Sequence, residues 1–408
     1  MRTWKNIGAV GREETLFFIA LHIYIADTFL EMSLYDYMWD RLILQAIKYS
    51  MMLFLALKWI LYEKYDLKKT LMWIAVLGCA VLSVLVGRYT SLLLAVSLAV
   101  SGEGIPFRKM VRHLLFGEIF WTAVIMLSCF VGILQDYTFP HAQAFEGAIA
   151  HSFGFKYYSL WGNLVLAFVM MWAFLRGKRV TWAEILLGFV LNYGLYRLHT
   201  TNLPYYICTA SLIAVIIISK FGFQFRGRFW KYAGILAPWL LFAATALIFI
   251  LHQRGIFTID RSKHYTLWSR FNYTQQAIDK YGIHLFGSDI KMLGNTKLMY
   301  GQAESSFYID SGYMYILLAY GICMAVILLF MYSVIMRYIS LKQESFLYAW
   351  VIVYLVMDII NNYTIDIYNI PVILLFASAF ALLPRGTALN LRRRAVKKRH
   401  DRYSIEQS

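Results

Sequence analysis

Arginine residues recur at the ends of, and between, the apolar segments of this 408-residue chain. They are Arg88, Arg197, Arg254, Arg261 and Arg270. A guanidinium group presents a rigid fork of N–H donors that can bind two oxygens of a phosphate or carboxylate at once. Any one of these arginines is best explained by an ion pair with a nearby Asp or Glu. The group as a whole predicts a phosphate site, for which a lipid-linked pyrophosphate at the membrane interface would be a natural partner.

Three of these arginines belong to a polar interval that runs from His252 to Asp310. The interval holds seven Lys and Arg residues, three His and many aromatic residues. It is the only long water-compatible stretch between apolar segments, so chemistry on charged, sugar-like or phosphate-bearing material is expected to use it. Its aromatic side chains could stack on sugar rings. Tyr and Trp also concentrate at membrane interfaces, and composition alone favours that explanation.

The composition excludes an ordinary soluble protein. The chain is 60% hydrophobic and 15% charged, whereas soluble domains carry roughly 25% charged residues. A membrane span needs about 20 mostly apolar residues and must be helical to satisfy its own backbone. We predict an all-α, polytopic integral membrane protein with about twelve transmembrane helices. The segments are 15–30, 42–61, 70–86, 89–101, 111–134, 159–175, 182–198, 204–219, 231–251, 311–336, 345–363 and 368–384.

The distribution of Lys and Arg predicts which side of the membrane each segment faces, because positive charge concentrates in cytoplasmic loops. With the N-terminus in the cytoplasm, 26 of the 39 Lys and Arg residues fall on the inner side. Both termini are then cytoplasmic, and the first apolar run is a retained anchor rather than a cleavable signal. The expected units are transmembrane helices 1–9 in residues 1–251, one large extracytoplasmic loop between helices 9 and 10 at 252–310, helices 10–12 in 311–384, and a basic cytoplasmic tail at 385–408.

Several classes of site are absent from the sequence. The four cysteines, Cys79, Cys129, Cys208 and Cys323, lie in apolar runs and are typical of buried small hydrophobes rather than disulfides or metal ligands. No nucleotide-binding or metalloprotease motif occurs, and the inner loops are too short for a nucleotide-binding domain. We expect no metal and no cofactor. The net charge of +16 is explained by topology and by contact of the tail with anionic lipid, not by nucleic acid binding.

Several ionisable residues fall within predicted spans, among them His22, Asp27, Glu118 and Asp358. A charge at the bilayer centre costs at least roughly 2.5–3.5 kcal/mol, so these side chains should face protein or a wet cavity. For Asp27 and Asp358, a structural pair and a polar cavity open to the outside are both consistent with the sequence. For Glu118, pairing inside the bundle competes with a functional role.

The 252–310 loop and the start of the next span resemble the Wzy-like polymerases of bacterial O-antigen and capsular polysaccharides. The loop contains WSRFNYTQQAIDKYGIHLFGSDI, and FYIDSGYMYILLAYGI leads into the span. In the family, an Arg precedes YG and LFG, and an aromatic–Asp–small–Tyr stretch ending in Gly enters the next span. The matching residues are Arg270, Tyr281, Gly282, Leu285, Phe286, Gly287, Asp310, Tyr313 and Gly321.

Two further stretches are similar to motifs of the same family. HSFGFKYYSLWG at 151–162 resembles HSxGFxxPNxxG, with matches at His151, Ser152, Gly154, Phe155 and Gly162. VSGEGIPFRKM resembles a short inner turn. The chain departs from the family at Ala150, at Tyr158–Ser159 and at 199–202, where the family usually has Arg, Pro-Asn and Ser-Arg-Thr. Arg197 lies just before the last of these departures.

The resemblance implies an enzyme of the bacterial cell membrane that joins undecaprenyl-pyrophosphate-linked oligosaccharide repeat units on the outer leaflet. Arg197 and Arg270, with Arg88 or Arg261, are then expected to bind the departing pyrophosphate. His151, His199 and Asp310 are the candidates for the base that deprotonates the acceptor hydroxyl. A helix-capping role is an equal alternative for Asp310. The implied partners are the lipid-linked glycan, membrane lipid, a flippase and chain-length regulator proteins.

Two other functions remain open at this point. A glycan ligase of similar fold, which moves finished glycan onto another acceptor, would use the same arginine chemistry. A flippase or exporter of lipid-linked oligosaccharide would also suit many spans and a cationic interior. The long 252–310 loop speaks against the flippase, because carriers of that type usually need only short loops.

Overall fold

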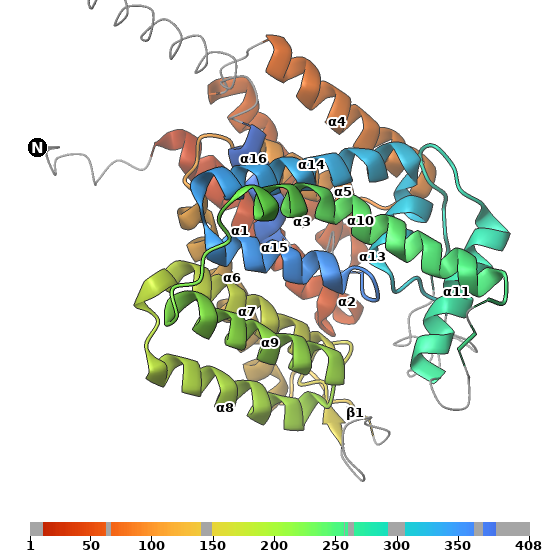
Figure 1. Cartoon of the computed structure of the whole chain (residues 1–408). Helices are drawn as coiled ribbons and strands as arrows, with labels where there is room; N and C mark the ends of the chain where they lie inside the picture. The colour runs from red at the N-terminus through yellow and green to blue at the C-terminus, as the bar shows by residue number, and fades with distance from the viewer. Residues whose placement is uncertain are drawn as a thin grey trace, which may run out of the picture.

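The computed structural model of the chain is almost entirely helical (Figure 1). It describes residues 11–62, 67–139, 149–256, 258–259, 265–292, 307–362 and 370–380. The first half contains α1 (Arg12–Met32), α2 (Tyr35–Met38), α3 (Arg41–Tyr62), α4 (Leu67–Gly87), α5 (Ser91–Ser101), α6 (Phe107–Phe130), β1 (Thr138–Phe139), β2 (Ala150–His151), α7 (Leu160–Arg176), η2 (Gly177–Arg179) and α8 (Trp182–His199). The second half contains α9 (Asn202–Ser219), α10 (Arg228–Gln253), α11 (Tyr265–Tyr281), α13 (Gly312–Tyr315), η3 (Ile316–Tyr320), α14 (Gly321–Lys342), α15 (Ser345–Met357) and α16 (Ile370–Phe380).

Helices occur at every predicted apolar segment, so the nearly all-α class is confirmed. Among the described residues, eight helices are long and apolar enough to cross a membrane, and α5 and α15 are shorter apolar helices. The total of about twelve spans stays a prediction.

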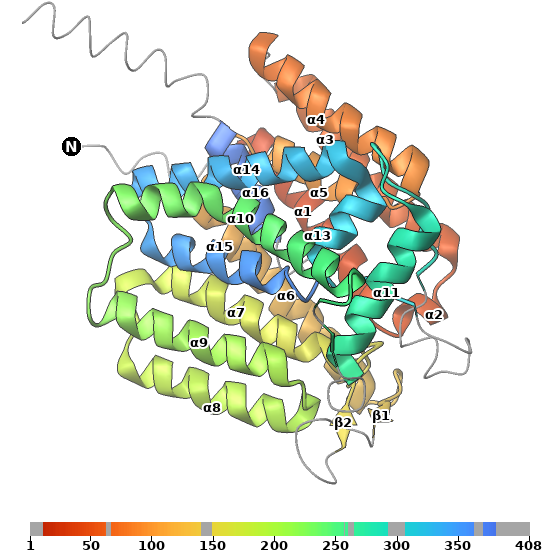
Figure 2. The same ribbon diagram turned by 45° about the vertical axis from the view of Figure 1, so that its right-hand side comes forward.

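The packing centre is α16, whose residues 371–377 are all buried and which contacts α5, α6 and α14. In Figure 2, α9 lies between α8 and α7, and it also contacts α15.

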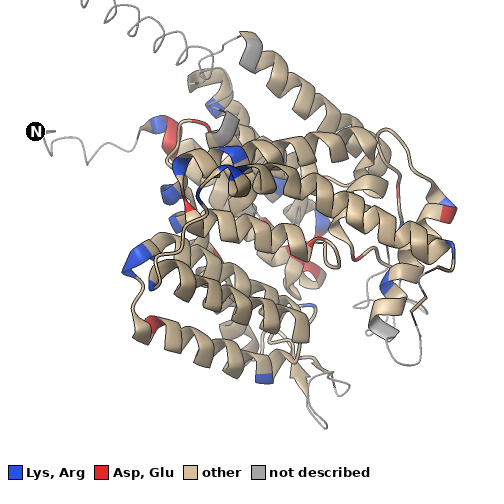
Figure 3. Ribbon diagram, in the orientation of Figure 1, with Lys and Arg blue, Asp and Glu red and all other residues tan. Residues whose placement is uncertain are grey.

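The long helices leave two distinct ends of the bundle. The short helix α2, the β1–β2 hairpin and α11 lie at one end, and α1 begins at the other (Figures 1 and 2). Lys and Arg residues gather at the end where α1 begins and α14 ends (Figure 3). In the predicted topology, the end richer in Lys and Arg is cytoplasmic, so the α11 end would face outward. We call the α11 end the predicted outer end.

The segment predicted as one span over 311–336 is interrupted. It begins as α13, continues as the π-helix η3, and restarts as α14 at Gly321, whose φ of +88° lies in the left-handed region. A break of this kind frees backbone groups that need partners inside a membrane protein. Residues with a side chain avoid this backbone conformation, so a glycine is needed at the break.

Backbone groups of the loop between α11 and α13 form hydrogen bonds with backbone groups at this break. The N–H groups of Ile322 and Cys323 donate to the carbonyls of His284 and Leu285 at 3.0 and 3.1 Å. Gly287 lies against the backbone of Ala319 so closely that a Cβ atom at position 287 would overlap it. Part of the predicted extracytoplasmic loop is therefore inserted against the broken helix and fixed there.

Some charged residues within the helices form ion pairs, whereas others have no hydrogen-bond partner among the described residues. Lys58 is fully buried and lies 3.4 Å from Glu13, and Lys48 forms an ion pair with Glu31. Glu118 is also fully buried, but neither of its carboxyl oxygens has a hydrogen-bond partner in the part of the chain described here. Pairing of Glu118, the structural alternative from the sequence, is therefore not observed. Asp27 is 3% exposed, and its Oδ1 likewise has no hydrogen-bond partner among the described residues.

Candidate functional site

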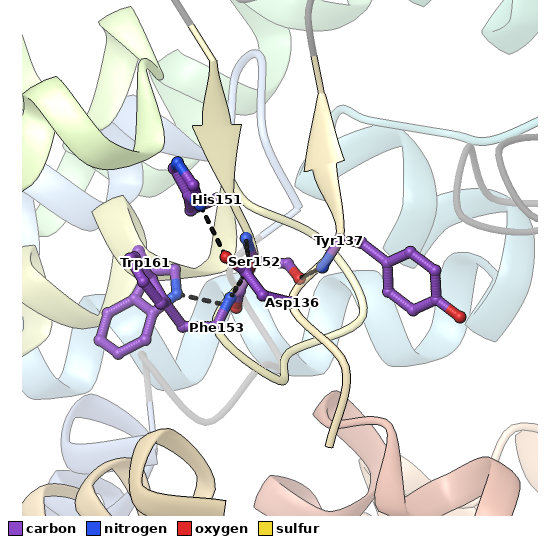
Figure 4. A network of polar contacts seen from close by, with 6 residues as sticks. All are labelled: Asp136, Tyr137, His151, Ser152, Phe153 and Trp161. Carbon is purple, nitrogen blue, oxygen red and sulfur yellow. Dashed lines mark hydrogen bonds and ion pairs between the residues drawn. The ribbon is translucent and has the colours of Figure 1, made fainter. Parts of the chain in front are cut away.

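The β1–β2 hairpin carries a histidine bound to a carboxylate. The strands are antiparallel, with Thr138 opposite His151, and Asp136 lies just before β1. The Nδ1 atom of His151 lies 2.6 Å from Oδ2 of Asp136 (Figure 4). The His151 side chain is 35% exposed, so the imidazole remains accessible. This pair is called the Asp136–His151 dyad below.

The second oxygen of the Asp136 carboxylate is held by the backbone. Its Oδ1 accepts hydrogen bonds from the N–H groups of Ser152 and Phe153 at 3.0 and 2.9 Å (Figure 4). The ring of Phe153 stacks on the His151 imidazole, with ring centroids 5.3 Å apart and 19° between the planes. The carboxylate and the imidazole are thus both fixed in orientation by the same short turn.

Buried polar contacts make this turn rigid. Ser152 is fully buried, its hydroxyl accepts from the N–H of Tyr137 at 2.9 Å, and its carbonyl accepts from Trp161 Nε1 at 3.1 Å. Phe153 and Gly154 both have positive φ, +46° and +84°. A Cβ atom on Gly154 would lie only 3.0 Å from Leu134, which explains why glycine is required there. The HSFG stretch therefore forms a tightly specified corner.

The hairpin lies beside the end of α8, which carries two other predicted site residues. Strand β2 contacts α8. Arg197 on α8 is exposed, whereas His199 is 1% exposed and its Nδ1 accepts from the backbone N–H of Thr201 at 3.0 Å. A Cβ atom on Gly162 would lie 3.1 Å from His199, so the α7–α8 packing encloses this histidine. Burial leaves His199 poorly placed to take a proton from a substrate.

A second group of predicted residues meets at the start of α13. Nε of Arg270 on α11 lies 3.5 Å from Oδ2 of Asp310, and the two side chains are 23% and 32% exposed. Ser311 is the residue that caps α13, because its hydroxyl accepts from the N–H of Met314. The alternative role of Asp310 as the helix cap is therefore wrong. Ser311 also donates to the carbonyl of the buried Asp358 at 3.2 Å, which ties this entrance to α15.

The Arg270–Asp310 pair predicts a measurable dependence of stability on pH. Burial raises the pKa of Asp310 above its usual value, and the guanidinium of Arg270 opposes that rise. A carboxyl whose pKa is raised on folding stabilises the fold while it is protonated, and this contribution is lost as the pH rises through the raised pKa. We expect the melting temperature of Asp310→Asn in detergent to fall less than that of the wild type from about pH 4 upward. Equal slopes for the two proteins would contradict this prediction.

Two other arginines, Arg88 and Arg261, were also predicted to bind the pyrophosphate. Arg88 is 79% exposed and lies 3.6 Å from Asp289, so the pairing alternative holds for it. Its neighbour Tyr89 donates to the carbonyl of Ile290, which places the corner between α4 and α5 against the inserted loop. Arg261 lies outside the described residues.

The structure thus brings Arg270 together with Asp310, and His151 together with Asp136. The β1–β2 hairpin, which carries His151, and α11, which carries Arg270, both lie at the predicted outer end (Figures 1 and 2). No hydrogen bond or ion pair of the described residues joins the dyad to Arg270. Asp136 was not among the sequence candidates, since an isolated acid fifteen residues before a histidine gives no recognisable signal.

A hollow elsewhere in the bundle contains none of the predicted site residues. It lies between α1 and α6, has a volume of about 790 Å³, and is lined mainly by apolar side chains such as Phe18, Ile23 and Phe120. His22 and His113 also line it, with Nε2 and Nδ1 3.1 Å apart. In the described ranges, no group of three or more His, Cys, Asp or Glu side chains could hold a metal ion.

Comparisons with known proteins add no family to this description. A scan against protein-family models, a search of curated proteins and a search of solved structures found no match to the chain.

Proposed function

We propose that the protein is a polysaccharide polymerase that joins undecaprenyl-pyrophosphate-linked oligosaccharide repeat units on the outer face of a bacterial cell membrane. One observation supports this proposal above the others. Residues of the polymerase-like motif that are distant in sequence contact one another at the predicted outer end. Arg270 pairs with Asp310, and the LFG stretch at 285–287 crosses the break at Gly321.

The reaction requires a cation for the leaving group and a base for the acceptor. The acceptor hydroxyl oxygen attacks the anomeric carbon of the growing chain, and the bond from that carbon to the lipid pyrophosphate breaks. The lipid pyrophosphate leaves with the electron pair, and the hydroxyl proton passes to a base. Arg270 is proposed to bind the developing negative charge, because preorganised donors in a partly buried site stabilise charge far better than water does. Arg197, exposed beside the hairpin, is proposed to assist.

Arg270 suits this role because only part of its guanidinium is engaged by the described residues. Its Nε faces Asp310, and no other partner of the guanidinium is seen among the described residues. The two Nη groups therefore keep donors for phosphate oxygens. Asp310 would hold the guanidinium in place until the pyrophosphate arrives.

The test uses cells that contain the complete pathway for this protein's glycan. Deletion of the gene is expected to leave single repeat units on the outer leaflet, and reintroduction of the wild type is expected to restore a ladder of longer glycans. The ladder is read on gels with leaflet-specific labelling. Long polymer that accumulates on the lipid carrier after deletion would instead indicate a ligase. Repeat units trapped on the inner leaflet would indicate a flippase or exporter.

A further inference from the structure

We infer that Asp136 and His151 form the acid–base centre of this protein, with His151 Nε2 accepting the proton of the acceptor hydroxyl and Asp136 acting as a positioning residue. The identity of the acceptor, a sugar hydroxyl, rests on the proposed function. The geometry of the dyad does not.

The hydrogen bonds determine which nitrogen of His151 is free. Backbone N–H groups can only donate, so Oδ1 of Asp136 accepts from both Ser152 and Phe153 and carries no proton. Two such donors on one oxygen favour the ionised carboxylate, and an ionised Oδ2 can only accept. His151 Nδ1 must then donate. A neutral imidazole that is protonated at Nδ1 presents an unprotonated Nε2, which is the form a general base needs.

The surroundings of the dyad fix its position as well as its protonation. The stack of Phe153 on the imidazole sets the plane of the ring, and the buried Ser152 and Trp161 hold the turn. His151 nevertheless keeps a third of its side chain exposed. A buried structural histidine would not need this exposure, and an exposed histidine without function would not need a carboxylate anchored by two backbone groups.

The other two candidate bases are less suitable. His199 is 1% exposed, and its Nδ1 already accepts a backbone hydrogen bond. Asp310 faces the guanidinium of Arg270 at 3.5 Å, so taking up a proton would weaken the interaction that orients Arg270. His151 is the one candidate whose accepting atom is both unengaged and accessible among the described residues.

The proposed step balances without a further reactant. The acceptor O–H bond breaks, its proton forms a bond to Nε2, and the oxygen forms the new bond to the anomeric carbon. His151 becomes an imidazolium, whose charge the Asp136 carboxylate stabilises across the 2.6 Å contact. Transfer of the proton to the departing pyrophosphate or to water returns the dyad to its starting state.

The first measurement is independent of activity. Solid-state NMR of the full chain in lipid, with nitrogen-labelled histidine, is expected to show His151 protonated at Nδ1 and bare at Nε2. Asp136→Asn keeps an oxygen for the two backbone N–H groups but turns an NH₂ donor toward Nδ1, so the tautomer should invert. Trp161→Phe is the matched control, because it removes a hydrogen bond from the same turn without touching the dyad. An Nε2-protonated His151 in the wild type would overturn the inference.

The second measurement is polymer formation by membranes supplied with lipid-linked repeat units. His151→Ala and Asp136→Asn are each expected to lower the rate by about 10²–10⁴-fold, the usual contribution of a general base. The double variant should be no slower than either single variant, and added imidazole should partly rescue His151→Ala but not Asp136→Asn. If both variants keep the wild-type rate while deletion abolishes polymer, the inference fails and the proposed function stands. If deletion leaves the glycan unchanged, the proposed function fails instead.

Discussion

Arg270→Ala is expected to abolish chain elongation and leave single repeat units on the lipid carrier, although the protein still folds. Loss of one preorganised donor to a developing charge typically costs about 10²–10³-fold in rate, or roughly 2.7–4 kcal/mol of barrier. Arg270→Lys should recover only part of this loss, because an ammonium keeps the charge but not the planar fork. Glycan ladders from complemented cells and initial rates in isolated membranes both measure the effect.

The variant Asp310→Asn distinguishes pyrophosphate binding by Arg270 from a purely structural ion pair. If Arg270 serves only to pair with Asp310, then Arg270→Ala and Asp310→Asn should have equal effects, and the double variant should match either one. If Arg270 binds pyrophosphate, Arg270→Ala should be much the slower variant. Arg88→Ala is the matched arginine control. Its side chain is 79% exposed and pairs with Asp289, so we expect a smaller loss of rate. An equal loss at both arginines would contradict a special role for Arg270.

The sequence was most informative where structure follows from local properties. Each predicted apolar run contains a helix, because a span needs only enough hydrophobic length, whereas α2 and α11 lie outside those runs and were not predicted. The chain from 311 to 336 shows the limit of this reasoning. Its apolar run continues through Gly321 without a polar residue, so nothing local predicts a break. The break exists because a distant backbone segment, His284–Leu285, supplies hydrogen-bond partners.

The sequence likewise predicted some features of the candidate site and missed others. Arg270 and Asp310 were expected in one site through the family resemblance, and the ion pair that they form is also what the pairing alternative predicts for an arginine. His151 was a candidate for the same reason, but its partner Asp136 was missed. Contact between positions 136 and 151 depends on the hairpin register, which a two-residue strand does not reveal in sequence. Burial of His199 likewise depends on how α7 packs against α8, and side-chain type alone does not predict it.

Gly321→Ala and Gly287→Ala are expected to prevent accumulation of folded protein. At both positions a Cβ atom would overlap backbone, that of Gly287 and Leu285 in one case and that of Ala319 in the other. Backbone fixed on both sides cannot move aside as a flexible side chain could. Left-handed or related strain costs roughly 1–3 kcal/mol, and overpacking typically adds roughly 1–3 kcal/mol. That sum is a large share of the marginal stability of a typical protein, about 5–15 kcal/mol.

Gly255→Ala isolates the close approach from the backbone strain. Gly255 has a φ of +69°, but a Cβ atom there would meet nothing within 4 Å among the described residues, so alanine should cost only the strain. Yield of monodisperse protein in detergent and thermal unfolding of any folded fraction compare the three variants. We expect Gly255→Ala to remain near the wild type in yield and the other two to be lost. If Gly321→Ala accumulates and melts like Gly255→Ala, the loop does not cross the broken helix. The contact between the 285–287 stretch and Gly321 would then no longer support the proposed function.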